Sequence, residues 1–341
     1  MNAVKKVLKA REMTALLFLA ALFVVVGIIN PAFLADSRNV ANCFNDSVVY
    51  ILIAVAMAFA IFIGEIDVSV GSNLGLVAAV VGTMLQDGKN WFLAFFIGIL
   101  MGTVVGLING WGVAVMKIPS LIFTLGTNGI LRGLMYLQVG TKQVTDLPIA
   151  FKGASSYALF GLPLTVCFFC VLLAAAAIHG VLTRTKRGRY FIAVGDNAGG
   201  AELVGIPATR TKVLAYVICG MLCAVAGILF ASRAGQVTSQ SGNGYEMKAV
   251  AACVLGGISL SGGVGSVVGA GVGAVIMASI SALLVFMGFS SNFDSAITGV
   301  ILITIVVVDA LVQRRAAVRN RHARLAARTN APAGGKEAAE Q

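Results

Sequence analysis

Charged residues are scarce in this chain. Asp, Glu, Lys and Arg make up 11% of its 341 residues, whereas a soluble domain carries about 25%. Histidine occurs only at His179 and His322, and there is no G-x-x-x-x-G-K-[ST] loop, no H-E-x-x-H pair and no Ser/His/Asp set. These absences argue against a soluble domain, a P-loop ATPase and a zinc hydrolase. We therefore expect no catalytic residue, no metal ion and no cofactor bound by this chain.

Cysteine is sparse as well, and its spacing does not suggest a metal or redox site. Cys167 and Cys170 form C-F-F-C within an apolar run, and Cys219 and Cys223 lie four residues apart on one face of a predicted helix. A metal site of the C-x-x-C kind needs a second pair of ligands at suitable spacing, and none is present. The pattern favours small apolar side chains at helix contacts.

Long apolar runs fill most of the sequence, of which 58% is hydrophobic. About 20 apolar residues of helix span a bilayer, whereas the strands of a membrane barrel alternate in polarity, which these runs do not. We predict an all-α polytopic membrane protein with about ten transmembrane helices (eight to ten), some of them short or broken. The predicted spans are 13–29, 47–64, 71–86, 92–116, 119–137, 160–182, 212–231, 246–260, 264–287 and 296–312.

Basic residues gather in three places: the N-terminal tail 1–12, the central loop 183–212 and the C-terminal tail 313–341. Positive charge marks the cytoplasmic side of membrane proteins, so both termini and the loop are predicted to be cytoplasmic, around a membrane domain at 13–312. The C-terminal tail is predicted to be disordered. Because it has no aromatic residue to stack on bases, it suits anionic membrane lipid and not nucleic acid.

The stretch E-I-D-V-S-V-G at 65–71 interrupts the apolar pattern. A charged side chain at the bilayer centre costs about 2.5–3.5 kcal/mol. We therefore interpret the stretch as a break between helices, with Asp67 or Ser69 as the N-cap of a helix that begins near Val70. The alternative is an ion-coupled secondary transporter that uses Glu65 and Asp67. A passive channel and a scaffold protein are further alternatives.

The central loop contains a turn signal, Gly195-Asp196-Asn197, followed by a short segment that ends before Pro207. The apolar residues of this segment are Ala201, Leu203, Val204 and Ile206. A short amphipathic helix of this kind suits docking into a groove on a partner protein. An ordinary solvated loop is the alternative.

Five stretches, in order, carry a family resemblance: "EIDVSVG" (65–71), "IPSLIFTLGTNGILRGL" (118–134), "TKRGRYFIAVGDNAGGAELVGI" (185–206), "GNGYEMKAVAACVLGGISLSGGVGSVVGA" (242–270) and "VVVDAL" (306–311). The chain resembles the permease subunit of ribose-type monosaccharide ABC importers, and is most similar to the rhamnose and autoinducer-2 group. The resemblance runs over residues 13–312. It departs at Glu65, where members usually have Gly, and at Val68, where they usually have Leu.

The resemblance implies a multi-pass protein of the bacterial inner membrane that imports a monosaccharide or a similar sugar-like solute by alternating access. Such permeases act as homo- or heterodimers, receive solute from a periplasmic or extracellular binding protein, and are driven by a separate cytoplasmic ATPase that uses ATP. The central loop would then be the segment that couples to this ATPase. Its expected contact residues are Gly195, Asp196, Asn197, Ala201, Glu202, Gly205 and Ile206.

A path for a neutral, hydrated sugar needs hydrogen-bonding side chains and no fixed charge. The candidates are Asp67, Ser69, Asn73, Asn109, Thr124, Thr127 and Asn128. Ser, Thr and Asn also cross-link membrane helices, so each has a structural alternative. Arg132 is expected to end a helix near the outer surface or to pair with an acid. Pairs of glycines four apart, at 265, 269 and 273, predict close helix packing.

Overall fold

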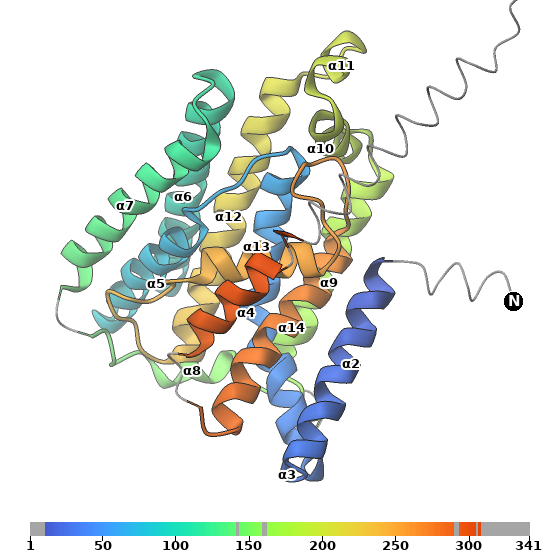
Figure 1. The fold of residues 1–341 in the computed structure, drawn as a ribbon. Coiled ribbons are helices and arrows are strands. Elements are labelled where there is room, and N and C mark those ends of the chain that lie inside the picture. The colour runs from blue at the N-terminus through green and yellow to red at the C-terminus, as the bar shows by residue number, and fades with distance from the viewer. Residues whose placement is uncertain (1–10, 141–142, 159–161, 290–292, 305, 308–341) are drawn as a thin grey trace, which may run out of the picture.

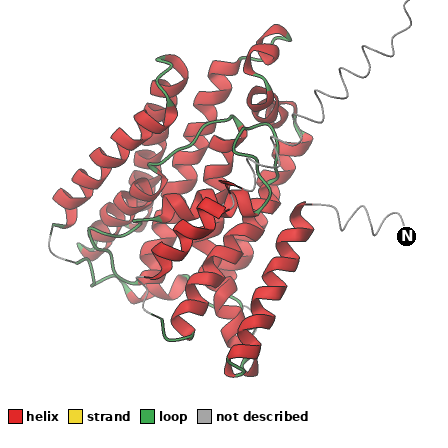
Figure 2. Cartoon of the chain, viewed as in Figure 1, coloured by secondary structure: helices red, strands yellow, loops and turns green. Residues whose placement is uncertain are grey.

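The structure is a computed structural model that describes residues 11–140, 143–158, 162–289, 293–304 and 306–307. Across these ranges the chain is helical, with two isolated β-bridges and no longer strand (Figure 2). The predicted C-terminal tail and most of the predicted N-terminal tail lie outside the described residues. The expected all-α class is confirmed.

The helices follow the predicted apolar runs (Figure 1). They are α2 (Arg11–Ile29), α3 (Ala32–Ala35), α4 (Ser37–Phe62), α5 (Val70–Gln86), α6 (Trp91–Gly110) with a π-helical turn at Trp111–Val115, α7 (Ser120–Val139), α8 (Ile149–Ala154), α9 (Val166–Arg184), α10 (Lys186–Asp196), α11 (Ala198–Leu203), α12 (Ala208–Ala234), α13 (Tyr245–Leu255), α14 (Val267–Phe286) and an apolar helix at Phe293–Thr304.

Within the described residues, five segments are long and apolar enough to cross a membrane: α4, Trp91–Val115, α9, α12 and α14. Shorter apolar helices lie at Ala15–Ile29, α5 and Phe293–Thr304. The span predicted at 246–260 is only the 11-residue helix α13. The expectation that some helices are short or broken is therefore confirmed.

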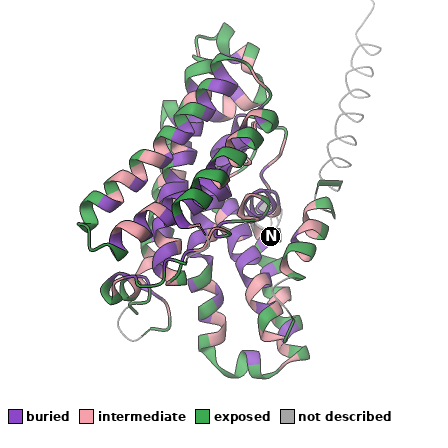
Figure 3. Ribbon diagram, turned by 90° about the vertical axis from the view of Figure 1, so that its left-hand side faces the viewer, coloured by how far each residue is buried: buried purple, intermediate pink, exposed green. Residues whose placement is uncertain are grey.

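Helix α4 runs through the centre of the bundle, and α12 and α14 pack beside it (Figure 1). From Ser47 to Phe62 every residue of α4 except Tyr50 is buried, because this part of the helix is apolar around almost its whole circumference. Buried residues are concentrated in these central helices, whereas exposed residues cover the outer faces (Figure 3). Helices α5 and α6 pack against α12 and α7 packs against α5, so the polar residues at the start of α5 lie inside the protein.

Two helices begin inside the bundle after a stretch of coil. Residues 63–69 precede α5, and residues 235–244 precede α13. The two starts touch: a Cβ on Gly71 would lie 2.4 Å from the carbonyl oxygen of Gly242, and a Cβ on Gly75 would lie 2.4 Å from that of Ser241. Only glycine allows this approach, so the two coil-to-helix breaks share one interior region.

Helices α10 and α11 lie at one end of the bundle, called here the α10 end (Figure 1). Two loops meet α10 there, one after α4 and one before α14. The amide of Gly263 donates to the carbonyl of Phe62 over 3.1 Å. A Cβ on Gly195 would lie 1.7 Å from that same carbonyl oxygen. The α10 end is therefore a tight junction of three backbone segments.

Candidate functional site

A buried chain of hydrogen bonds forms around Asp67. The Asp67 carboxylate accepts from the amide of Ser69 over 2.9 Å and from its hydroxyl over 2.6 Å. Asn109, on α6, donates to the Ser69 hydroxyl over 2.8 Å and lies 3.4 Å from both carboxylate oxygens. Thr127, on α7, donates to the Asn109 side-chain oxygen over 2.8 Å. Asp67, Ser69 and Asn109 are each at most 2% exposed.

A second set of contacts holds the coil before α5 against α7 and α12. The hydroxyl of Thr124 accepts from the amide of Val68 over 3.1 Å, and that of Ser120 accepts from the amide of Ile66 over 3.4 Å. From α12, the thiol of Cys219 lies 3.8 Å from the Asp67 carboxylate. A buried carboxylate is tolerated where hydrogen-bond donors surround it. We call Asp67, Ser69, Asn109, Thr124 and Thr127 the Asp67 network.

The predicted N-cap differs in detail from the structure. Ser69 occupies the N-cap position of α5, but its hydroxyl donates to Asp67 and makes no bond to the helix amides. Asp67 accepts the backbone amide of Ser69, which orients the coil just ahead of the helix. The carboxylate therefore supports the start of α5 through Ser69.

Two of the predicted path residues lie apart from this network. Asn73, on α5, reaches the close contact between α6 and α12, with weak contacts of 3.5 and 3.4 Å to the carbonyls of Gly102 and Gly220. Asn128 is half-buried, and its side-chain oxygen has no hydrogen-bond partner among the residues that the structure describes. Arg132 lies within α7, not at a helix end, and donates to the carbonyl of Ser241 over 2.8 Å.

Glu65 and Asp67 are close in sequence but have separate partners. Glu65 pairs with Lys212 at the start of α12, over 2.5 Å, while Asp67 faces the amide and hydroxyl donors of its network. Among the described residues, no group of three His, Cys, Asp or Glu could hold a metal ion. The two acids therefore do not form one ion-binding site.

At the α10 end, the predicted coupling residues have two different environments. Gly195 lies against the backbone of Phe62 and Gly263 and is an internal contact. Asn197 caps α11, accepting the amide of Gly200 over 2.9 Å, and Ala201 is buried. These residues position α11 within the chain itself, since their partners belong to the same protein.

The exposed residues of this segment form a different set. Asp196, Glu202 and Gly205 are exposed and Ile206 is half-buried. Gly205 has φ +82° and open space around its Cβ position. Glycine is favoured here by the left-handed backbone and not by a close contact with a neighbour. Leu203 and Val204 are 90% and 76% exposed. The apolar pattern of the loop included both, but only the fold shows that they form its outward tip.

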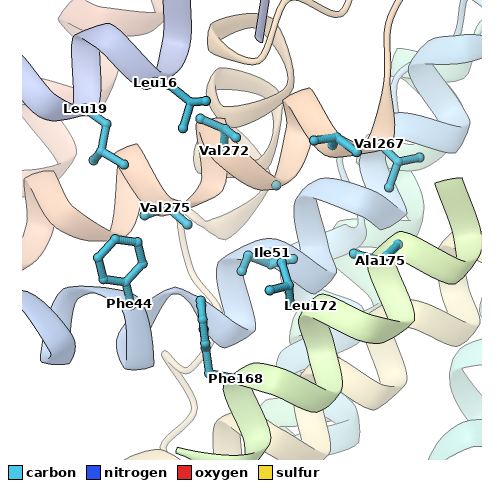
Figure 4. Close-up of a pocket in the computed structure, with 13 residues that line it drawn as sticks. Leu16, Leu19, Phe44, Ile51, Phe168, Leu172, Ala175, Val267, Val272 and Val275 are labelled. Carbon is cyan, nitrogen blue, oxygen red and sulfur yellow. The ribbon is translucent and has the colours of Figure 1, made fainter. Parts of the chain in front are cut away.

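The cavities of the bundle differ in polarity. One, of 230 Å³, lies among α2, α4, α9 and α14 and is lined by apolar side chains such as Leu19, Phe168 and Val272 (Figure 4). It offers no hydrogen-bond partner to a hydrated solute. Another, of 540 Å³ at the α10 end, is lined by residues that include His179, Arg189 and Asp196.

Comparison with known proteins places this architecture among permeases. A family described as "branched-chain amino acid transport system / permease component" matches residues 39–306. The chain is similar to a protein named "Autoinducer 2 import system permease protein LsrC" from Enterobacter sp. (strain 638), with 40% identity over 94% of this chain and 92% of the relative. Relatives of the same name show 38% identity in Klebsiella pneumoniae (94% and 92% covered) and 37% in Salmonella typhi (88% and 85% covered). No solved structure matches the chain.

Proposed function

The chain belongs to the family described as branched-chain amino acid transport system / permease component, and from that premise we propose that it imports a small, neutral, sugar-like solute. It is a permease of an ABC importer and a multi-pass protein of the inner membrane. The observation that carries the solute class is the similarity, over nearly the whole chain, to relatives named for autoinducer-2 import. Autoinducer-2, ribose and rhamnose are the solutes to test first.

The proposed partners are a second permease subunit, an ATPase at the α10 end and an extracytoplasmic solute-binding protein. The α10 end is taken as cytoplasmic because Lys186, Arg187, Arg189, Arg210 and Lys212 gather there. The exposed apolar tip at Leu203 and Val204 suits insertion into a groove on the ATPase.

The coupling would pass through backbone contacts. Movement of α11 carries α10, because Asn197 both ends α10 and caps α11. The end of α10 packs through Gly195 onto Phe62, where α4 gives way to the coil that leads to Asp67. A displacement of the tip would therefore reach the start of α5, and alternating access would follow from this helix shifting against its neighbours.

The test is uptake into proteoliposomes that contain the permease, its ATPase and its binding protein. We expect ATP-dependent accumulation of autoinducer-2, and loss of both accumulation and ATPase association in Leu203→Asp. Thr209→Asp, which adds the same charge at an exposed position at the same end, should retain both. ATP-independent accumulation driven by an ion gradient would contradict the proposal and support the secondary-transporter alternative.

A further inference from the structure

A third cavity lies at the end of the bundle opposite α10 and α11, among α4, α12, α13 and α14. Its volume is 350 Å³, within the range of about 300–1,000 Å³ that is typical of small-molecule sites. Aromatic, charged and small residues line it: Asp46, Val49, Tyr50, Phe230, Arg233, Ala234, Tyr245, Ala278, Ser281 and Ala282. None of the predicted path residues is among them.

One wall of this cavity is aromatic. The rings of Tyr50 and Tyr245 stack with centroids 5.2 Å apart and an interplanar angle of 28°. Phe230 meets Tyr245 edge-on, at 5.8 Å and 88°. Aromatic faces carry negative potential and aromatic edges positive potential. Such a wall suits the C–H face of a sugar ring, which is apolar and weakly positive.

The charged residues at and beside the cavity are paired. Arg233 and Asp46 form an ion pair, and the Asp46 side chain keeps 50% of its exposure. Ser281, another lining residue, donates to Asp294 over 2.8 Å. Lys248 pairs with Asp294 and donates to the hydroxyl of Tyr50, with Nζ lying 5.3 Å from the centre of that ring.

The paired charges at the cavity favour a neutral ligand that carries hydroxyl groups. Of the residues that line the cavity, Arg233 carries a positive charge and Asp46 a negative charge, and the two sum to zero. The neighbouring Lys248–Asp294 pair, which contacts the lining residues Tyr50 and Ser281, also sums to zero. A charged solute would find an opposing charge already neutralised. Hydroxyl groups, which both donate and accept, could bond to either member of a pair. Charged side chains within membrane helices are costly and commonly mark substrate pathways.

We propose that this cavity binds a neutral, hydroxyl-rich solute of monosaccharide size on its way through the permease. The sugar ring lies on one outer face of the stacked Tyr50–Tyr245 pair, and its hydroxyls bond to the Arg233–Asp46 pair and to Ser281. The inference rests on the proposed function and names the site that such a solute would occupy. A lipid chain is a poorer occupant, because it cannot bond to the charged groups of this cavity. It would suit the apolar cavity among α2, α4, α9 and α14, which lacks such groups (Figure 4).

Binding is tested without transport, on the full permease in lipid nanodiscs, by saturation-transfer NMR. The probes are autoinducer-2, ribose and rhamnose, with ribose 5-phosphate as the charged comparison. Ala282→Trp fills the cavity, and Ala282→Ser keeps its volume as the matched control. We expect transfer to at least one neutral probe in the wild type and in Ala282→Ser, and its loss in Ala282→Trp. Ribose 5-phosphate should show none in any protein.

A second variant separates binding from misfolding. Asp46→Asn removes a charge at the exposed rim and should weaken binding about tenfold, with an unchanged size-exclusion profile. Equal transfer in the wild type and Ala282→Trp would overturn the proposal, as would the absence of transfer to every neutral probe. If Ala282→Trp loses binding but ATP-driven uptake continues, the cavity lies off the path and this inference fails while the proposed function stands. Absence of uptake by the wild type would instead count against the proposed function.

Discussion

The ammonium group of Lys212, at the start of α12, lies 2.5 Å from a carboxylate oxygen of Glu65. Their side chains keep 23% and 18% of their exposure, so the pair is only partly removed from water. Glu65 stands where the resembling family usually has Gly, and Lys212 compensates for its charge. The pair also joins the coil before α5 to the helix that follows the central loop. Its position explains how the membrane domain accommodates this acid.

Glu65→Gln should lower stability only slightly. A partly exposed ion pair contributes about 0.2–1 kcal/mol, and Lys212→Gln should cost a similar amount, with no further loss in the double variant. Uptake should continue in all three and should not respond to a protonophore. Stability is measured by thermal unfolding in detergent. A folded Glu65→Gln protein without uptake would show that the carboxylate takes part in transport.

Asp67→Ala should destabilise the permease strongly. It leaves the hydroxyl and the backbone amide of Ser69 without their buried acceptor, at about 1–3 kcal/mol for each unsatisfied group. Thr103→Ala is the control, because within the described part of the chain the Thr103 hydroxyl bonds only to the carbonyl of Ile99 in its own helix. Thermal unfolding is again the measurement. An unchanged unfolding temperature for Asp67→Ala would mean that the Asp67 network does not hold the helices together.

Gly195→Ala should prevent normal packing of the α10 end. Its new methyl group would lie 1.7 Å from the carbonyl oxygen of Phe62, which is backbone and cannot turn aside. Gly205→Ala meets open space and should cost only about 1 kcal/mol, from its left-handed backbone. The amount of folded protein in the membrane, measured by fluorescence size exclusion, should fall for the first variant only. Equal yields would contradict the tight junction.

Gly273→Ala should disrupt the contact between α13 and α14. A Cβ at Gly273 would lie 1.9 Å from the carbonyl oxygen of Ala252, and one at Gly269 would lie 2.1 Å from that of Gly256. Gly271, on the same helix, has open space at its Cβ position, so Gly271→Ala provides the matched control. We expect a lower unfolding temperature for Gly273→Ala alone. Two equally stable variants would show that these helices tolerate a wider separation.

Much of the fold could be predicted because each membrane helix is a continuous apolar run that is visible in the local sequence. The apolar runs predicted the helices, and Gly269 and Gly273 were predicted at a close contact that the structure contains. The partners of polar residues could not be predicted in this way. Asp67 and Asn109 are 42 residues apart, and no local pattern distinguishes an amide that meets a carboxylate from one that faces a solute.

For the predicted coupling segment, too, the helix could be predicted from the sequence but its contacts could not. Sequence pattern alone located a short apolar segment between Asn197 and Pro207, because turn residues and Pro limit a helix through their own backbone preferences. Which side of that segment faces outward depended on the packing of α10 against Phe62 and Gly263. Gly195, which was predicted to contact a partner, packs against Phe62 and Gly263 of its own chain, whereas Leu203 lies at the exposed tip.

The sequence by itself determined the class of the protein, its apolar helices and the breaks between them, because lipid requires long apolar helices and charge is costly within it. Only the tertiary structure decided that Asp67 is enclosed by donors from the coil before α5, from α6 and from α12. It also decided that Lys212 neutralises Glu65, and that Tyr50, Arg233 and Tyr245 line one cavity. These relationships join residues far apart in the chain. These contacts form only when the packing of α4, α12 and α14 brings the residues close together.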